Sequence, residues 1–204
     1  MNFEYSDEQQ QLADSVGKYL ANAYGFEQRK AILGSASGVS DTAWATFAEM
    51  GLTAIALPEA DGGFGGGAVD LMAVMEACGE ALVVEPLLDN VGLAGRLLAK
   101  AGTSAQKAAL LPGLIDGSVR LAAGLLESGQ RYGLMPVATT AEKSGDGWLL
   151  SGGKCVVVGA ASAQRLIVSA RTGDGASLFI VDPQAAGVSL NPSRTVDGLR
   201  VADV

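Results

Sequence analysis

The sequence contains no histidine, and this absence excludes several kinds of catalytic centre. Serine and cysteine nucleophiles of the usual triads need an imidazole as general base, and many zinc sites need one as a ligand. None of these can be built from this chain alone. Only two cysteines are present, Cys78 and Cys155, far apart and in apolar surroundings. We therefore expect two small buried core residues in a reduced protein, not a disulfide.

Long hydrophobic runs and an excess of positive charge are also missing. No stretch approaches the roughly 18 uncharged apolar residues of a membrane-spanning helix. Among the 204 residues, 49% are apolar and 18% are charged, which excludes a disordered chain. The formal net charge of -8 argues against binding to duplex nucleic acid, whose partners carry basic patches. The N-terminus lacks a basic segment followed by an apolar one, so we expect no secretory signal and a cytoplasmic protein.

The charge is distributed unevenly along the chain. Residues 1–117 contain 15 acidic and 6 basic side chains, a net charge of -9. Residues 118–204 contain 7 acidic and 8 basic side chains, a net charge of +1. This shift predicts a boundary at Asp116 and Gly117, with one domain over residues 1–116 and a second over 117–204. An anionic ligand is expected to lie against the second.

The first half has the periodicity of helices. Ser6 and Gln9 form a capping box, and further caps are expected at Ser40 or Asp41 and at Thr103. Gly51 is expected to be left-handed after its helix, and the last helix to end at residues 112–113. The apolar stripes that mark the predicted helices are Leu12, Val16 and Leu20; Trp44, Phe47 and Met50; Leu71, Met75, Cys78 and Leu82; and Val91, Ala94 and Leu98.

The second half changes to short runs of Val, Leu and Ile between turns of Gly, Asp and Pro. The predicted strands are residues 120–126, 148–151, 154–158, 165–170 and 177–181. The fold class is therefore α+β: an N-terminal all-helical domain followed by an antiparallel β-barrel or sandwich. Residues 196–204 look like a turn entering a strand without a partner. From this we expect an incomplete β-domain that is part of a longer protein.

One glycine-rich segment suggests a dinucleotide site. Residues 63–68 match G-x-G-x-x-A after a strand-like run at 52–57, and Glu85 lies about 20 residues further on, where a ribose-binding acid belongs. This leaves open an NAD(P)-binding oxidoreductase. Against it, residues 58–62 separate the run from the first glycine, and the carboxylates of Glu59 and Asp61 would repel a pyrophosphate. The strands of such a fold also do not follow, so we expect a flexible connection between helices.

An ordered set of short motifs resembles the acyl-CoA dehydrogenase family. Trp44 is followed by M-G-L at 50–52, A-L-P-E at 56–59, G-G at 62–63, M-E at 75–76 and E-P at 85–86. G-L-L-E at 124–127 stands where that family has A-L-T-E, and residues 145–154 (G-D-G-W-L-L-S-G-G-K) are similar to its hairpin. Residues 177–181 and 187–188 resemble its next strands. No single motif is specific, but the set is collinear over essentially the whole chain.

The resemblance implies the FAD-dependent α,β-dehydrogenation of an acyl-CoA thioester, an oxidoreductase reaction of fatty acid metabolism and lipid degradation. In the family, a carboxylate removes the pro-R α-proton, a β-hydride passes to N5 of FAD, and a trans-2-enoyl-CoA forms. The base is a glutamate of a C-terminal helical bundle that is missing here, so no catalytic residue is assigned. Glu76 and Glu80 are expected to form a solvated or salt-bridged helix face.

The resemblance also implies the partners: an acyl-CoA substrate, an electron-transfer flavoprotein or similar acceptor, and a related subunit in a homo- or hetero-oligomer. The residues implied at the cofactor come from two segments, Leu125, Leu126 and Glu127 in the first and Val156, Val157 and Val158 in the second.

Three of these residues depart from the family. Leu126 replaces a threonine that hydrogen-bonds the flavin ring, Val156 replaces an aromatic residue that packs on it, and Val158 replaces a hydroxyl. Residues 128–132 likewise do not match P-x-x-G-S-D, and Lys154 and Arg131 are interpreted as surface charges. These departures leave open a flavin-poor structural partner, similar to the small subunit of heteromeric acyl-CoA dehydrogenases such as the pimeloyl-CoA and steroid-degrading kinds.

Overall fold

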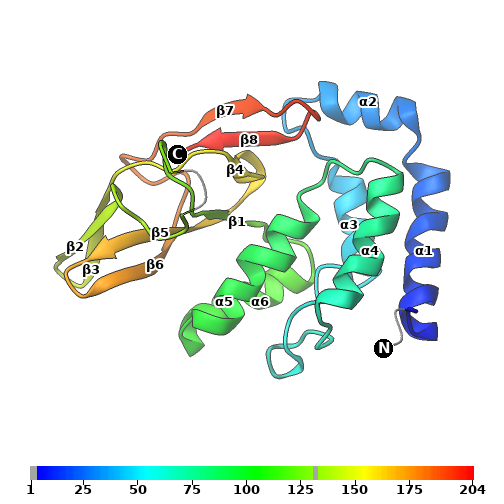
Figure 1. Ribbon diagram of the computed structural model, residues 1–204, viewed down its shortest axis with the longest axis horizontal. Coiled ribbons are helices and arrows are strands. Elements are labelled where there is room, and N and C mark those ends of the chain that lie inside the picture. The colour runs from blue at the N-terminus through cyan, green and yellow to red at the C-terminus, as the bar shows by residue number, and fades with distance from the viewer. Residues whose placement is uncertain (1–3, 131–132) are drawn as a thin grey trace. The chain divides into compact units, whose positions relative to one another are not determined.

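The computed structural model describes residues 4–130 and 133–204, so Arg131 and Tyr132 lie outside the described residues. The chain divides into two compact units, Met1–Ser118 (unit 1) and Val119–Val204 (unit 2). Unit 1 is helical and unit 2 is built from strands, which confirms the α+β class and the order of its parts (Figure 1). Within the described residues, no helix is long and apolar enough to cross a bilayer.

Helix α1 (Asp7–Ala23) begins at the predicted capping box. The Ser6 hydroxyl accepts the Gln9 N–H, and the Gln9 side chain accepts the Ser6 N–H. Its buried residues, Val16 and Leu20, belong to the expected stripe. A side-chain hydrogen bond of 3.1 Å from Gln9 to Asp70 ties α1 to helix α4 (Ala68–Glu80). The cap therefore sets where the helix starts, and the stripe sets which side faces the unit.

Helix α2 (Phe26–Gly34) was not predicted from the sequence. It buries none of its residues, so it carries no apolar stripe from which a helix could be predicted. Helix α3 (Asp41–Glu49) begins at Ser40, whose hydroxyl accepts the Ala43 N–H. Gly51 follows it in the predicted left-handed conformation, with φ +77°. A side chain at this position would also meet the ring of Phe64, because an added Cβ would lie 2.4 Å from it.

The end of helix α4 differs from the prediction. The helix stops at Glu80, and Leu82, expected on its apolar stripe, is left-handed with φ +53° and 62% exposed. Cys78 on the same stripe is buried as expected, and burial, with a smaller contribution from Glu85, raises the pKa of its thiol to about 12. Cys155 is half-buried, so the expectation of a buried core residue was wrong for it; both thiols are free, as expected.

The last helices of unit 1 follow a short 3-10 turn η1 (Glu59–Asp61) and a π-helical segment η2 (Leu88–Gly95), which continues as α5 (Arg96–Ala101). Helix α6 (Ser104–Ile115) starts at the predicted Thr103 cap. Its predicted end at residues 112–113 was wrong, because the helix continues through Pro112 to Ile115. Leu114 in the added turn is fully buried, and this packing offsets the hydrogen bond that proline cannot donate.

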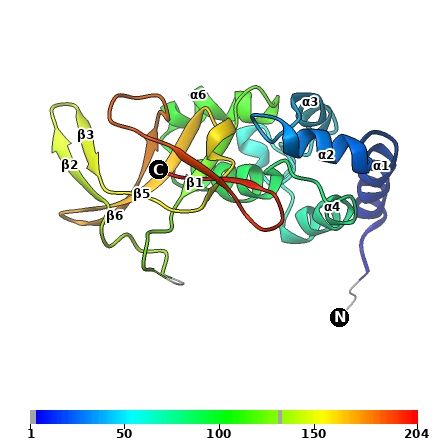
Figure 2. The same cartoon turned by 90° about the horizontal axis from the view of Figure 1, so that it is seen from above.

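Unit 2 contains two sheets. The larger has the order β1-β5-β2-β3, with β6 also paired to β5, and the smaller has the order β4-β8-β7. The strands of the larger sheet are β1 (Leu121–Gly124), β2 (Thr140–Ser144), β3 (Gly147–Ser151), β5 (Arg165–Thr172) and β6 (Gly175–Val181). Those of the smaller sheet are β4 (Val157–Val158), β7 (Asn191–Arg194) and β8 (Arg200–Asp203). The β2–β3 and β5–β6 hairpins project at the same side of the unit (Figures 1 and 2).

The pairing of the strands differs from the prediction in two respects. The hairpins are antiparallel, but β1 runs parallel to β5, pairing Leu121 with Arg165. Strand β8 has partners on both sides, so the expectation of an unpaired terminal strand was wrong. Strands β2 and β7 were missed because neither contains an apolar run; three of the five residues of β2 and all four of β7 are exposed.

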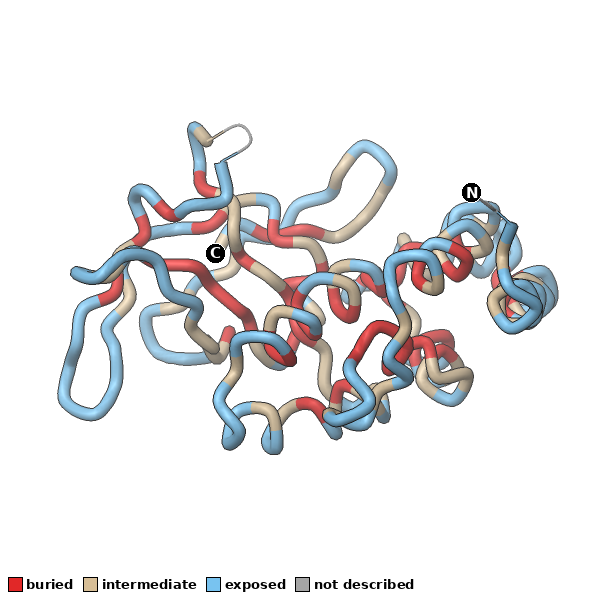
Figure 3. The backbone as a smooth tube through the Cα atoms, turned by 60° about the horizontal axis from the view of Figure 1, so that its bottom comes forward, coloured by how far each residue is buried: buried red, intermediate tan, exposed pale blue. Residues whose placement is uncertain are grey.

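The core of unit 2 gathers small and branched residues from β1, β4, β5, β8 and the 3-10 turn η3 (Ala160–Ser162). Its members are Ala122, Val157, Ala160, Ala163, Leu166, Val168 and Ala202. In Figure 3 the buried stretches lie inside each unit, whereas loops and hairpin turns are mostly exposed. The first segment implied at the cofactor, residues 125–127, directly follows β1. The second, residues 156–158, includes β4 and the residue before it.

Candidate functional site

The glycine-rich segment lacks the features of a nucleotide site. Residues 52–57 form turns instead of a strand, and residues 63–67 form a loop, as predicted. The N–H groups of residues 63–66 donate to carbonyl oxygens of residues 54–58, and the Gly67 N–H donates to Asp70. A phosphate cradle needs free amides at this place, and these amides are all occupied.

Glu85 is also not placed to bind a ribose. It is 5% exposed, and it accepts the Tyr24 hydroxyl at 2.5 Å and the Ser40 N–H at 2.8 Å. Burial and this carboxylate raise the pKa of Tyr24. The NAD(P) alternative was therefore wrong. Glu76 and Glu80 are exposed as predicted, and Glu76 accepts the Tyr5 hydroxyl.

The structure brings the two segments implied at the cofactor side by side in unit 2. The Cys155 N–H donates to the Leu126 carbonyl oxygen at 2.9 Å. Val157 lies in the core, whereas the side chains outside it are half-buried or, at Val156, 48% exposed. We call these outer side chains the two-segment surface: Leu125, Leu126, Val156 and Val158. It offers apolar contact area and no side-chain hydroxyl or aromatic ring.

Glu127 points away from this surface and into unit 2. It is 2% exposed, and its carboxylate accepts the Lys154 ammonium at 2.8 Å. It also accepts the N–H groups of Val137, Ala138 and Thr139 at 2.9, 2.7 and 3.0 Å. Four donors therefore surround one carboxylate. Because Glu127 directly follows Leu126, these bonds fix the end of the first segment.

The charge of Glu127 is stabilised by its partners. Burial on its own raises the pKa of this carboxyl group, but hydrogen bonds from Lys154 and residues 137–139 outweigh burial and hold the pKa of Glu127 well below its usual range. A carboxylate whose oxygens already accept four donors and whose charged form is stabilised in this way is a poor general base. Its role is to hold structure around the two-segment surface.

Lys154 was predicted to be a surface charge, and this was wrong. The side chain is 2% exposed and donates to Glu127 and, at 3.0 Å, to the buried Ser169 hydroxyl on β5. Its neighbours in the chain give no signal of this burial, because Gly153 is exposed and Cys155 is half-buried. Ser169 and residues 137–139 gave no such signal, since only the folded chain brings them to Glu127.

Val156 has an unusual backbone conformation. It is left-handed, with φ +53°, although it is β-branched. Its N–H donates to the Asp203 carboxylate at 2.9 Å. On one side of it, Lys154 and Val204 exchange two backbone hydrogen bonds of 2.7 and 2.8 Å. On the other side, Val157 pairs with Ala202 of β8. Asp203 was not singled out from the sequence.

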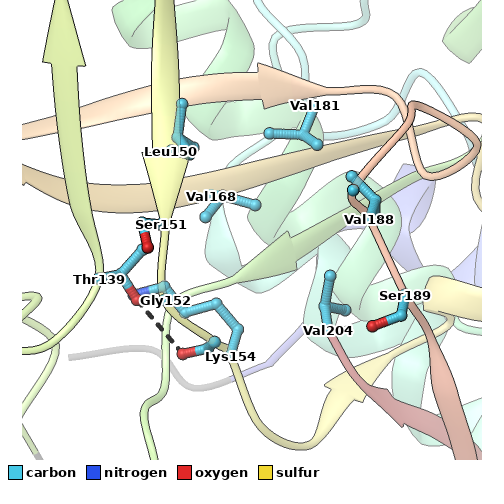
Figure 4. Close-up of a pocket in the computed structure, with 12 residues that line it drawn as sticks. Thr139, Leu150, Ser151, Gly152, Lys154, Val168, Val181, Val188, Ser189 and Val204 are labelled. Carbon is cyan, nitrogen blue, oxygen red and sulfur yellow. Dashed lines mark hydrogen bonds between the residues drawn. The ribbon is translucent and has the colours of Figure 1, made fainter.

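A cavity of about 130 Å³ lies in unit 2, and Lys154 is one of the residues that line it (Figure 4). Valine and leucine side chains form much of its wall, in which the Thr139 hydroxyl donates to the Gly153 carbonyl oxygen. Lys154 is its one charged residue, and its ammonium is already bound elsewhere. The cavity therefore offers no reactive group. Nor do the described residues contain a group of three or more side chains suited to a metal ion.

Comparison with known proteins gives matches over both units. Residues 6–118 match the family model of the acyl-CoA dehydrogenase N-terminal domain, and residues 122–204 match that of its middle domain. Acyl-CoA dehydrogenase FadE12 of Mycobacterium tuberculosis is 33% identical over 202 residues, which cover 94% of this chain and 50% of the relative.

Solved structures give the same result for the fold. A variant of the Tcur3481-Tcur3483 steroid ACAD is 34% identical with a TM-score of 0.88, covering 97% of this chain and 54% of that chain. The ChsE4-ChsE5 complex from Mycobacterium tuberculosis is similar in fold, with 24% identity and a TM-score of 0.90 over 100% of this chain and 54% of that one. The chain thus spans about half the length of the relatives it matches.

Proposed function

The chain belongs to the acyl-CoA dehydrogenase family, and we propose that the complete protein takes part in the FAD-dependent dehydrogenation of an acyl-CoA thioester to a trans-2-enoyl-CoA. The observation that carries this proposal is the two-segment surface. The two segments that the resemblance implies at the flavin lie side by side, joined by the hydrogen bond from the Cys155 N–H to the Leu126 carbonyl oxygen, although many residues separate them in the chain. The proposal concerns the whole protein, because this chain spans half of its relatives.

The two-segment surface fits one property of a flavin ring and lacks another. Leu126, Val156 and Val158 supply apolar area against which a flat ring can pack. None of them supplies the hydroxyl donors or the aromatic face that the resemblance expects at these positions. We infer that this chain holds FAD through fewer contacts than family members that keep those groups.

Bound FAD supplies the acceptor for the β-hydride of the substrate. This chain orients the cofactor and excludes water from it. The apolar side chains cover one face of the cofactor site, and the Glu127–Lys154 pair holds the two segments in position. The α-proton must go to a base within hydrogen-bond reach. We assign no described residue to that role, since Glu127 is saturated by donors, and we expect the base in the part of the protein beyond these domains.

A second candidate is favoured by the same surface. Leu126, Val156 and Val158 all replace residues that contact the flavin in the family. Such a chain could act as a structural partner in a hetero-oligomer, in which a related subunit carries the intact flavin site. In support, the name of the similar solved structure, a Tcur3481-Tcur3483 steroid ACAD, gives two components. An electron-transfer flavoprotein or similar acceptor would then receive the electrons from the assembly. The electron acceptor and the cytoplasmic location stay predictions.

The flavin content of the full-length protein separates the two candidates. Losing a hydroxyl donor and an aromatic contact costs on the order of 1 kcal/mol each, which weakens FAD binding by roughly tenfold to a hundredfold. The full-length protein expressed alone is expected to purify with little flavin, and co-expression with a neighbouring paralogous gene to restore the yellow colour. Stoichiometric FAD in the protein expressed alone would instead identify a self-sufficient dehydrogenase.

The position of the base is tested on the 204-residue chain itself. Loaded with FAD, it is expected to show no turnover of butyryl-, octanoyl- or steroid-side-chain-CoA esters in an assay with an artificial electron acceptor. Turnover of any of them would place a base among these residues and contradict the assignment.

A further inference from the structure

Two non-glycine residues are left-handed among the residues that the structure describes, Leu82 and Val156, each with φ +53°. Side chains rarely adopt this conformation, and a β-branched one adopts it least readily. Such residues persist only where surrounding contacts impose the conformation, and they occur often at functional sites. The contacts around each residue therefore show why it is held.

Leu82 is explained by the local end of a helix. Its N–H donates to the Gly79 carbonyl oxygen at 3.0 Å, and the Val83 N–H donates to that of Cys78 at 3.0 Å. This pair of bonds is the Schellman motif, in which the residue after the last turn is left-handed. The conformation follows from the termination of α4, and the Arg29 side chain of α2 also donates to the Leu82 carbonyl oxygen at 2.7 Å.

Val156 has no such local cause. Its N–H is held by Asp203, from the end of β8, and the preceding residues are held by Val204 and Leu126. The following residue, Val157, is fixed by core packing and by pairing with β8. Every contact that holds this turn comes from a segment distant in sequence. The carboxylate accepts a charge-assisted hydrogen bond, which is stronger than a neutral one.

We propose that Asp203 is a positioning residue that holds Val156 in its left-handed conformation and so fixes how Val156 projects from the two-segment surface. Were the N–H released, rotation of this residue toward an extended conformation would relieve the strain and move the exposed side chain. The positional role toward a cofactor rests on the proposed function. The conformational role of Asp203 does not.

The conformational role is tested by coupling two substitutions. Glycine adopts the left-handed conformation without strain, so Val156→Gly is expected to raise the equilibrium ratio of folded to unfolded protein about fivefold in urea titrations. In a chain that also carries Asp203→Ala, residue 156 is free to relax, and the same substitution is expected to give no gain. Leu82→Gly is the matched control, with the same φ and a gain that does not depend on residue 203. Asp174→Ala, at an exposed turn carboxylate of unit 2, is the control for loss of charge.

The positional role is tested by FAD titration of the full-length protein, co-purified with its partner subunit where it has one, followed by flavin fluorescence. Asp203→Ala and Val156→Gly are each expected to raise the dissociation constant at least fivefold, and Leu82→Gly and Asp174→Ala to leave it unchanged. An equal gain from Val156→Gly with and without Asp203 would overturn the proposal. So would intact coupling with unchanged FAD affinity, because Asp203 would then be structural only. If the parent protein binds no FAD under any condition, the proposed function and the positional role both fall, while the coupling still decides whether Asp203 holds Val156.

Discussion

Each unit buries one glutamate, and the two are satisfied in different ways. In unit 1, Glu85 accepts hydrogen bonds from the neutral Tyr24 hydroxyl and the Ser40 amide. In unit 2, Glu127 accepts three amides and the buried ammonium of Lys154. The sequence suggested both residues as cofactor ligands, Glu85 for a ribose and Glu127 for the flavin. Instead, both carboxylates tie segments together within their unit, and only Glu127 adjoins the surface proposed for FAD.

The comparison shows two ways to stabilise a buried carboxylate: by neutral donors alone, or by amides together with a cation. Breaking a buried ion pair by removing its cation leaves an uncompensated charge and costs more than losing a hydrogen bond from a neutral hydroxyl. Unit 2 is therefore expected to be much more sensitive to its lysine than unit 1 is to its tyrosine. The variants that follow test this ordering.

The largest effect is expected from Lys154→Met, which keeps the length of the side chain and removes its charge. Glu127 would stay buried with its amides but without a cation, so we expect unit 2 to lose about 3–5 kcal/mol in urea unfolding. Lys143→Met, on an exposed strand beside Trp148, is the control and is expected to lose less than about 1 kcal/mol. Adding Glu127→Gln to Lys154→Met should recover part of the loss, because glutamine carries no charge and its carbonyl oxygen can still accept the N–H groups of Val137 and Ala138. No recovery would show that packing of the lysine, not charge, dominates.

A smaller effect is expected from Tyr24→Phe in unit 1. The substitution removes the donor to Glu85 and the acceptor of the Val84 N–H, both buried, at a cost of about 1–3 kcal/mol. Tyr19→Phe is the matched control: its ring packs edge-on against Phe47, and that contact is kept. Thermal melts of the two variants measure the difference. A loss equal to that of Lys154→Met would contradict the distinction between the two glutamates.

The two units are also expected to respond to opposite extremes of pH. The pKa of Glu127 is lower in the folded protein than its ordinary value of about 4.3, so its contribution is complete above that pH and is lost as the pH falls below it. The pKa of Tyr24 is raised, so its contribution is complete below about pH 10 and is lost as the pH rises further. Hydrogen-exchange mass spectrometry, which follows peptides of each unit separately, should show residues 137–139 opening first in acid. Glu127→Gln should flatten this acid dependence and leave the alkaline one unchanged.

The smallest effect is expected from Ser169→Ala. Lys154 loses one of its two acceptors but keeps Glu127, so the cost is about 1–2 kcal/mol. Ser177→Ala, at an exposed position of the neighbouring strand, serves as control and should change the urea midpoint little. A larger loss from Ser169→Ala than from Tyr24→Phe would reverse the ordering.

Local signals in the sequence predicted much of this fold and little of its polar interior. The caps at Ser6, Ser40 and Thr103 and the switch from helical to strand periodicity were sufficient for the class and the order of the units. Helix α2 carries no apolar stripe and strand β7 no apolar run, so neither leaves a pattern in the sequence.

The candidate site was found through family resemblance, and its supporting residues were not found. Lys154 looks in sequence like any surface lysine, since only folding brings it to Glu127 and Ser169. Asp203 acts through one hydrogen bond to a residue far away in the chain. Pairings of this kind are set by tertiary contacts, which no local pattern records.

The central claim is that the two-segment surface belongs to the flavin site and is weakened by its apolar substitutions. The most direct test is calorimetric titration of FAD into the full-length protein and its Leu126→Thr/Val158→Thr variant, with Leu178→Thr on the exposed part of β6 as control. The account predicts that the double variant binds FAD at least about tenfold more tightly than the parent, and that the control does not. Tight stoichiometric binding by the parent, with no gain in the double variant, would contradict it.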